Sequence, residues 1–355
     1  MNEITLEKTL NEYEVVIIGA GPAGCFLVKN LTEDYRVLLV DKSPIPRVKS
    51  CGGMLVEESQ EIISKLNPPD YVFVNPKELG LSYIDHDNKI WKDSNRKFWN
   101  VFRGPFDYWL SRILDKKQYD FVSNTELLDF EIKTSGIKLK LKNEAIKYIK
   151  TKYLIGADGA RSIIRRRIAN PIKKYLAVQK YYETDDQKVD RAVFIFNNQI
   201  TDFYSWIIPK QLYFVVGSAL PLQNTNEKFR LFEKSLSKTI KLSKNIEIEA
   251  ALLSRPQSKN DVCLGKGDIF LVGEAAGLVS PSFGEGISFA LRSSQNLAKA
   301  LNEDFRFPHI GYRRLCDPLV KELNDKIKKA EILSNPKMRA NFINNNYVEL
   351  VEKLK

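Results

Sequence analysis

The sequence predicts an α/β protein in which a Rossmann-like dinucleotide-binding domain carries an inserted antiparallel β-sheet domain and ends in helices. Three observations predict this class. In residues 15–24 an apolar strand leads into a Gly-x-Gly-x-x-Gly turn and a helical stretch. Between Lys174 and Arg255 most segments are short, aromatic and β-branched, which is typical of an antiparallel sheet. The stretch from His309 onward is helical and basic.

The glycine turn has the spacing of a dinucleotide site. Gly19 permits the tight turn, Gly21 lets the backbone approach a pyrophosphate, and Gly24 allows close packing of helix on strand. The helix that follows directs its N-terminus at the phosphate charge. A second apolar strand, residues 37–40, ends at Asp41, about 20 residues after the first glycine, where an acid hydrogen-bonds an adenosine ribose.

The composition is that of a globular protein large enough for two joined domains. The chain has 355 residues, of which 43% are hydrophobic and 28% charged. It contains no run of 18 apolar residues, and its N-terminus lacks the basic start and apolar core of a signal peptide, so we expect a cytoplasmic location. Four widely spaced cysteines and two histidines suggest neither a zinc site nor a disulfide scaffold, and we expect no metal.

The formal net charge of +11 favours acidic partners such as an anionic membrane surface, nucleic acid or a phosphate-bearing substrate, but solubility alone is the more ordinary explanation. Much of the excess lies in short mixed runs such as residues 165–167, with no recognisable nucleic-acid module around them. We therefore expect no nucleic-acid partner.

The remaining elements are predicted from hydrophobic periodicity and from the prolines and glycines that interrupt helices and strands. Pro44 and Pro46 lead into Cys51-Gly52-Gly53, a backbone-dominated loop. Helices are predicted at residues 57–66, 106–114, 226–242 and 286–301. Short strands are predicted within residues 71–99, 126–142 and 153–155, and at residues 175–182, 192–196, 203–208, 212–216 and 269–272.

Three glycine-and-charge clusters each follow a predicted strand, at residues 19–24, 156–162 and 273–286. Loops at the carboxyl ends of strands in a doubly wound sheet converge on one crevice. We therefore expect the three clusters to line one extended ligand. In the third, the small residues Ala275, Ala276 and Gly277 allow backbone amides to approach an anion or a ring oxygen.

These residues together resemble the flavin-dependent geranylgeranyl reductase family, which shares the para-hydroxybenzoate hydroxylase fold. The resemblance extends to about Leu301 and is closest to the bacterial CbrA-type branch of that family. The matching features are the first glycine turn, the Cys51-Gly52-Gly53 loop, Arg103 with Phe106-Asp107, the Gly156–Ser162 run, the Gly273–Gly286 run, and Tyr204-Ser205-Trp206-Ile207-Ile208-Pro209 with Gly217 beyond it.

The resemblance implies FAD as the cofactor. It places Asp41 at the ribose, Arg103 near the phosphates, and Asp158 and Gly159 on the other side of the flavin. Glu274 stands where the family usually has an Asp that contacts the ribityl chain. The implied cofactor-binding set is Gly19, Gly21, Pro22, Ala23, Gly24, Asp41, Lys42, Cys51, Gly52, Arg103, Asp158, Gly159, Gly273, Glu274, Gly284, Gly286 and Ile287. The structural alternatives are a helix N-cap for Asp158 and a surface salt bridge for Arg103.

The resemblance also implies a substrate pocket, with Cys51, Tyr204 and Trp206 as candidate lining residues. Tyr204 and Trp206 alternate along a predicted strand and so share one face, suited to a pocket or simply to the sheet core. Cys51 would face the reactive side of the flavin; the alternative is a small buried thiol, and pairing with Cys316 is conceivable.

The implied activity is reduction of carbon–carbon double bonds in a geranylgeranyl-type polyprenyl lipid by hydride transfer from reduced FAD. The alternatives are a flavin-dependent monooxygenase or halogenase acting on an aromatic ring, and a non-catalytic flavin-binding protein. The electron donor is open between NAD(P)H and a ferredoxin-like carrier, because no second Gly-x-Gly-x-x-Gly appears. The basic surface and C-terminal helices could bring the enzyme to the inner face of an anionic membrane.

We expect a discontinuous domain organisation. The FAD-binding domain would comprise residues 1–70, 100–172 and 262–308. The substrate-binding antiparallel-sheet domain would comprise residues 71–99 and 173–261, and a C-terminal helical segment residues 309–355.

Overall fold

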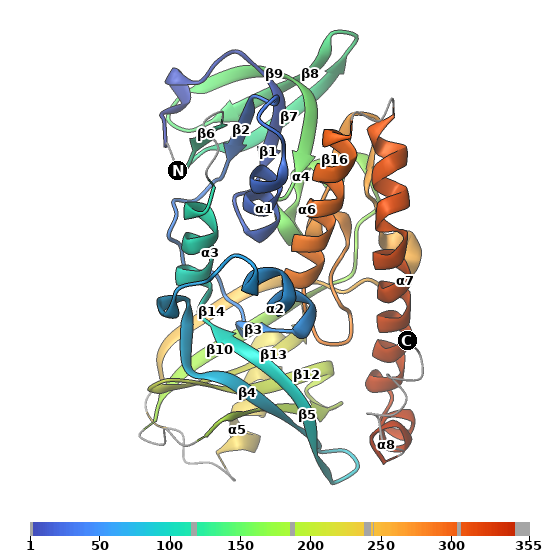
Figure 1. Ribbon diagram of the computed structural model, residues 1–355. Coiled ribbons are helices and arrows are strands. Elements are labelled where there is room, and N and C mark those ends of the chain that lie inside the picture. The colour runs from blue at the N-terminus through green and yellow to red at the C-terminus, as the bar shows by residue number, and fades with distance from the viewer. Residues whose placement is uncertain are drawn as a thin grey trace.

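Two eight-stranded sheets lie one above the other, and helices run beside both of them (Figure 1). The computed structural model describes residues 3–114, 119–184, 189–237, 243, 245–303 and 307–344. The first strand, β1, belongs to the upper sheet, and the long helix α7 follows one side of the molecule from the upper sheet to the lower one (Figure 1).

The upper sheet is built on a parallel core in the order β16-β9-β1-β2-β6. Its parallel strands are β1 (Glu12–Ile18), β2 (Val37–Val40), β6 (Tyr119–Val122), β9 (Ile146–Gly156) and β16 (Ile269–Leu271). The antiparallel additions are β7 (Glu126–Lys133), β8 (Gly136–Lys142) and β15 (Gly265–Lys266). Because the parallel strands run in one direction, their carboxyl ends, and the loops that follow β1, β9 and β16, meet at one edge.

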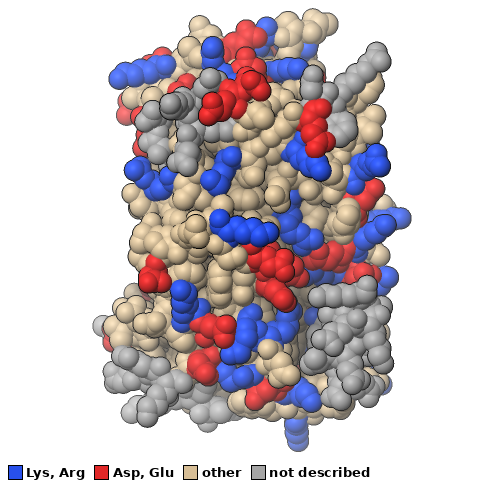
Figure 2. Space-filling view, viewed as in Figure 1, with Lys and Arg blue, Asp and Glu red and all other residues tan. Residues whose placement is uncertain are grey.

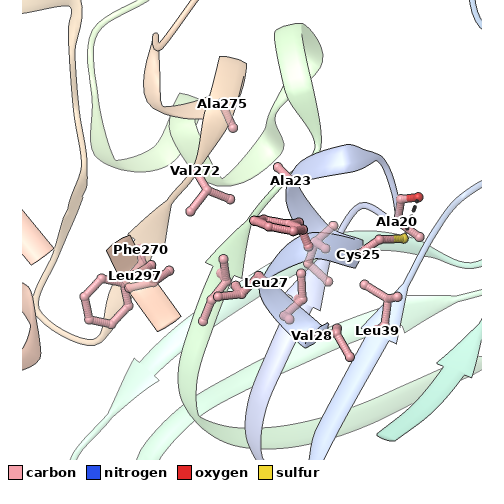
Figure 3. Close-up of a cluster of buried hydrophobic side chains, with 14 of the residues drawn as sticks. Ala20, Ala23, Cys25, Leu27, Val28, Leu39, Phe270, Val272, Ala275 and Leu297 are labelled. Carbon is pink, nitrogen blue, oxygen red and sulfur yellow. Dashed lines mark hydrogen bonds between the residues drawn. The ribbon is translucent and has the colours of Figure 1, made fainter. Parts of the chain in front are cut away.

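Helices α1 (Pro22–Asn30) and α6 (Ile287–Asn302) pack against each other on this sheet. Figure 3 shows the apolar contact region, in which Leu27 of α1 and Leu297 of α6 lie in the same cluster as Phe270 of β16. Small side chains such as Ala23 keep the start of α1 close to its neighbours. The packing fixes the position of the first glycine turn relative to the third.

The lower sheet has the order β14-β10-β13-β12-β11-β4-β5-β3. Its strands are β3 (Met54–Leu55), β4 (Phe73–Asp85), β5 (Ile90–Val101), β10 (Lys174–Glu183), β11 (Arg191–Asn197), β12 (Thr201–Lys210), β13 (Tyr213–Pro221) and β14 (Asn245–Ser254). Helix α5 (Thr225–Leu236) covers one face through Phe229 and Phe232, which pack with Ile207 and Val216. The opposite face bears the aromatic residues described below.

Several predicted boundaries differ from the structure. Residues 71–99 were expected to form short strands, but β4 and β5 are 13 and 12 residues long and pair as one hairpin; exposed polar residues along them obscured the alternation. The lower sheet also contains one parallel pair, β11 with β4. The helix predicted over residues 226–242 ends at Leu236, and residues 238–242 lie outside the described part of the chain.

Five further α-helices lie within the described residues. Helices α2 (Glu57–Ser64) and α3 (Arg103–Arg112) lie between the sheets in the view of Figure 1, and the short α4 (Ile163–Ile168) follows β9. Helix α7 (Pro308–Ser334) leads to α8 (Pro336–Asn344), whose buried Arg339 donates to both carboxylate oxygens of Asp85 on β4 at 2.8 and 2.9 Å. This ion pair fastens the end of the described chain to the lower sheet. None of the helices among the described residues has the length and apolar character needed to cross a bilayer.

Candidate functional site

The three glycine clusters converge, as expected. A Cβ on Gly19, in the first cluster, would lie 2.4 Å from the carbonyl oxygen of Ala157, in the second. A Cβ on Gly159 would lie 3.8 Å from Oε2 of Glu274, in the third. Loops more than 100 residues apart in the chain therefore touch at the edge of the upper sheet.

Asp41 stabilises the first glycine turn through hydrogen bonds to its carboxylate. Its carboxylate is 4% exposed; Oδ2 accepts from the Ala20 amide at 2.7 Å and Oδ1 from the Ser43 amide at 2.9 Å. Oδ1 also pairs with Arg47 at 2.5 Å. The other guanidinium nitrogen of Arg47 comes within 3.5 Å of the Cβ position of Gly21, so this arginine lies over the first glycine turn. Sequence reasoning missed Arg47, because nothing in the Pro-rich segment around it indicates that it folds back onto the turn.

Arg103 and Asp107 form a buried, bidentate ion pair on α3. Nε and Nη2 donate to the two carboxylate oxygens at 2.8 Å each, and the Arg103 side chain is 10% exposed. Burial opposes the charge of Arg103, but Asp107 outweighs it and raises the pKa of the guanidinium above its usual value. The alternative of a surface salt bridge is therefore wrong: the pair is internal.

Arg103 belongs to a group of positive charges beside the turn. Lys49 has its pKa lowered by desolvation of its ammonium group and then by repulsion from Arg103, while Glu274 and Cys51 act in the opposite direction. With Arg47, these residues bring three cations to one place. Such a group favours a phosphate-bearing ligand.

Asp158 has one engaged and one unengaged oxygen. Oδ2 accepts from the Ile163 amide at 2.9 Å, close to the start of α4, whose own cap is Ser162. Oδ1 is buried and has no hydrogen-bond partner among the described residues. Burial raises the pKa of this carboxyl. A buried acceptor without a donor fits a hydroxyl-rich chain such as the ribityl of FAD, so the cap and the ligand contact can coexist on one side chain.

Glu274 reaches across to the other sheet. Its Oε1 accepts from the backbone amide of Ser254, the last residue of β14, at 2.7 Å. Burial raises the pKa of the carboxyl, and the Ser254 bond opposes that shift. The Glu274 side chain, one methylene longer than that of Asp, thus forms a contact between the third glycine cluster and the lower sheet.

Most of the other predicted cofactor residues lie in the first and third glycine clusters, whereas Lys42 and Gly52 lie in the loops after β2 and before β3. Gly273 has φ +56° and donates its amide to Ser293 Oγ at 2.9 Å, while Gly284 has φ +65°. Gly286 precedes Ile287, the first residue of α6, and Pro22 is the first residue of α1. The remaining members lie in the first turn (Ala23, Gly24), in the loop after β2 (Lys42, exposed) and in the loop before β3 (Gly52).

The Cys51-Gly52-Gly53 loop lies on the lower sheet. Gly53 has φ +62°, and a Cβ there would lie 1.9 Å from the Val101 carbonyl oxygen, so glycine is required. Cys51 is partly exposed, and Cys316 is buried in α7; both are free thiols, so the conceivable pairing is not formed.

The buried side chain of Lys210 holds this loop through hydrogen bonds. The side chain is 1% exposed, and its Nζ donates to the carbonyl oxygens of Gly53 at 3.4 Å and Val101 at 2.7 Å and to Asn100 Oδ1. Burial lowers the pKa of Lys210 to about 7. Sequence reasoning missed it, because a lysine at the end of a strand is normally exposed.

Tyr204 and Trp206 share the face of the lower sheet that meets the upper domain. Both belong to one aromatic cluster, with ring centroids 5.7 Å apart. Ile207, the residue after Trp206 on β12, packs on the opposite face of the sheet. Tyr204 Oη donates to the carbonyl oxygen of Phe283, in the third glycine cluster, at 2.6 Å. The aromatic face and the cofactor loops therefore form one continuous site.

The comparisons with known proteins agree with this geometry. The family described as "FAD binding domain" matches residues 107–306. The fold and the site thus define a flavoprotein, and FAD is its cofactor, as predicted. Among the described residues, no group of three or more His, Cys, Asp or Glu side chains could hold a metal ion.

Relatives are found over nearly the whole chain. Protein CbrA of Escherichia coli strain K12 is 30% identical over 351 residues, covering 93% of this chain and 96% of the relative. Protein CbrA of Escherichia coli O6:H1 is also 30% identical, with 93% and 92% covered. The chain belongs to the FAD-dependent oxidoreductase family that contains CbrA.

Solved structures confirm the fold class. A geranylgeranyl bacteriochlorophyll reductase-like protein from Thermoplasma acidophilum superimposes with a TM-score of 0.76 at 19% identity, covering 95% of this chain and 91% of the other. The flavin-dependent brominase Bmp2 superimposes with a TM-score of 0.69 at 19% identity, covering 94% and 92%. At these identities the similarity concerns the fold alone.

Proposed function

We propose that this protein uses FAD to reduce carbon–carbon double bonds of a polyprenyl lipid or a related apolar substrate. The observation that carries the proposal is the aromatic face of the lower sheet where it meets the cofactor loops. Neighbouring rings on this face have centroids 4.6 to 6.3 Å apart. They belong to Tyr83, Phe194, Phe196, Tyr204, Trp206 and Phe283.

An apolar substrate gains from this face in two ways. Aromatic side chains bury large areas against hydrocarbon, and the buried setting excludes water from the reacting carbons. Reduced FAD, when bound, supplies a hydride for one carbon of the double bond, and a proton for the other carbon completes the saturation. The chain's own contribution is to hold the flavin and the substrate in contact.

Tyr204 contributes by position and not as an acid. Its hydroxyl proton is already donated to the Phe283 carbonyl, and burial raises the pKa of the phenol well above its usual value. We therefore assign Tyr204 to holding the loop of residues 281–286 against the sheet. Trp206, whose ring lies next to it, supplies apolar contact to the substrate.

The test compares three mixtures containing the flavin-reduced enzyme. The first contains geranylgeraniol without oxygen, the second an indole or phenol with oxygen, and the third the same aromatic compound with oxygen and bromide. The proposal predicts a saturated product in the first mixture only. Hydroxylated or brominated product in the others would favour the monooxygenase or halogenase alternative, and no product in any mixture would favour a non-catalytic flavin-binding role.

We also propose that the enzyme associates peripherally with anionic membrane, because its substrate would reside there and its net charge is +11. On the face shown in Figure 2, however, Lys and Arg alternate with Asp and Glu, so any basic surface is not concentrated there. Co-sedimentation with vesicles of anionic and of neutral lipid tests this; equal recovery with both would contradict it. The donor of electrons, NAD(P)H or a ferredoxin-like carrier, would be found by testing each against the oxidised protein.

A further inference from the structure

Two buried polar atoms on the aromatic face have no partners and flank one glycine. Gln179 Oε1 and Trp206 Nε1 lack hydrogen bonds within the described chain, although the two residues are only 1% and 6% exposed. Gln179 on β10 and Trp206 on β12 each pair directly with Gly217 on β13. Directly opposed residues of antiparallel strands share a face, so both side chains project to the same side.

The missing side chain of Gly217 leaves room for the Trp206 indole on this face of β13. Trp206 Nε1 lies 2.6 Å from the place where a Cβ of Gly217 would be, so the indole lies across the glycine that separates β12 from Gln179 on β10. Any larger residue at Gly217 would occupy this space.

The orientation of the Gln179 amide follows from its partners. Its Nε2 donates to Glu249 Oε2 at 2.8 Å and to the Cys51 carbonyl oxygen at 3.5 Å, and Tyr181 Oη lies 3.2 Å away. A carboxylate and a carbonyl only accept hydrogen bonds, so the amide nitrogen must face them and the oxygen is left over. An indole N–H only donates. The face therefore presents one unpaired acceptor and one unpaired donor on the two strands that flank Gly217, and a ligand that satisfies both atoms is favoured over one that leaves them unpaired.

We propose that Gln179 and Trp206 bind a neutral hydroxyl group of the substrate. The hydroxyl hydrogen donates to Gln179 Oε1, and the hydroxyl oxygen accepts from Trp206 Nε1. This inference rests on the proposed function and narrows its substrate to a prenyl alcohol. A hydrocarbon would leave both atoms unpaired, whereas an ionised phosphate or carboxylate offers no hydrogen to Gln179 and would lie near the charge of Glu249.

The experiment measures binding of three ligands to the oxidised, FAD-loaded protein by equilibrium dialysis. They are geranylgeraniol, its methyl ether, and a prenyl hydrocarbon of similar length. We expect the alcohol to bind about tenfold more tightly than the hydrocarbon, as one satisfied hydrogen-bonding pair allows. The ether, which accepts but cannot donate, should fall between them.

Two variants separate the two atoms. Trp206→Phe should weaken binding of the alcohol and of the ether, each by no more than its advantage over the hydrocarbon, and should leave binding of the hydrocarbon nearly unchanged. Gln179→Met should weaken only the alcohol, because the ether has no hydrogen to donate. Ser205→Ala is the matched control, because Ser205 is adjacent to Trp206 on β12 but faces the opposite side of the sheet, where it bonds to Ser218. This variant should keep the wild-type order of affinities for the three ligands. FAD content and circular dichroism verify that each variant is folded.

Equal binding of alcohol and hydrocarbon by the wild-type protein would overturn the inference and leave prenyl reduction standing. A Trp206→Phe variant that loses affinity equally for all three ligands would also overturn it, since the indole would then act as an apolar wall alone. Failure of the wild-type protein to bind any of the three would reject the proposed function together with the inference.

Discussion

Replacing Gly217 with alanine should disturb the aromatic face through a single new methyl group. The new Cβ would lie 2.4 Å from Cε2 and Cζ2 of Trp206. Carbon atoms pack best about 3.5–4.0 Å apart, so the indole must move by about 1 Å. It is buried and packs against Tyr204, and overpacking of this kind costs about 1–3 kcal/mol of unfolding free energy. The φ angle of Gly217 is not in the left-handed region, so the backbone itself adds no strain.

Urea unfolding of four proteins measures this effect: wild type, Gly217→Ala, Trp206→Leu and the double variant, each saturated with FAD. In the Trp206→Leu background the obstructing ring is gone, so alanine should cost little, and we expect a coupling of about 1–2 kcal/mol. Gly104→Ala is the control, because its nearest foreign atom would be at an ordinary 3.5 Å; it should not destabilise. The same loss for Gly217→Ala with and without the tryptophan would refute the reasoning.

Three further predictions concern the contacts around the site. Burial lowers the pKa of Lys210 to about 7, so the folded protein releases a proton that the unfolded chain keeps until about pH 10.4. Between these pH values the unfolding free energy of the wild type should therefore rise by up to about 1.4 kcal/mol per pH unit relative to that of Lys210→Met. The same pH dependence of the urea midpoint in both proteins would contradict this. Arg103→Ala should weaken FAD binding by about 10–100-fold, measured by flavin release. A double variant that also lacks the Asp107 carboxylate should recover stability but not FAD affinity. Full retention of flavin by Arg103→Ala would count against the assignment of Arg103 to the phosphates. Glu274→Asp should lose the hydrogen bond to Ser254, which lowers the unfolding free energy, measured by thermal unfolding, by about 0.5–1.5 kcal/mol, and should change FAD affinity little. A large loss of FAD affinity would indicate that Glu274 contacts the cofactor instead.

The parts of the fold that depend on local sequence could be predicted. The turn after β1, the strand that delivers Asp41 and the alternation that places Tyr204 and Trp206 on one face all follow from short-range spacing. The convergence of the three glycine clusters was predictable for the same reason, since parallel strands carry their following loops to one edge.

The parts that depend on long-range packing could not. Arg47 lies over the first turn only because the segment after β2 folds back, and Lys210 is buried only because Gly53 and Val101 present carbonyl oxygens to it. The hydrogen-bonding pair of Gln179 and Trp206 depends on the register of three strands, which no local pattern specifies.

The long hairpin of β4 and β5 illustrates the same limit at the level of secondary structure. Its exposed face carries charged residues that interrupt the apolar alternation, so the sequence pattern resembles several short strands. The pairing with β11 on one side keeps the hairpin in the sheet.

One measurement tests the central claim most directly: a single anaerobic turnover of the FAD-reduced protein with geranylgeraniol, in which flavin reoxidation and loss of lipid double bonds are counted in the same sample. Delivery of a hydride from the flavin to the lipid predicts one flavin reoxidised for each double bond lost, with a matching gain of hydrogen mass in the lipid. Flavin that stays reduced in the presence of the lipid and reoxidises only when oxygen is admitted would contradict it.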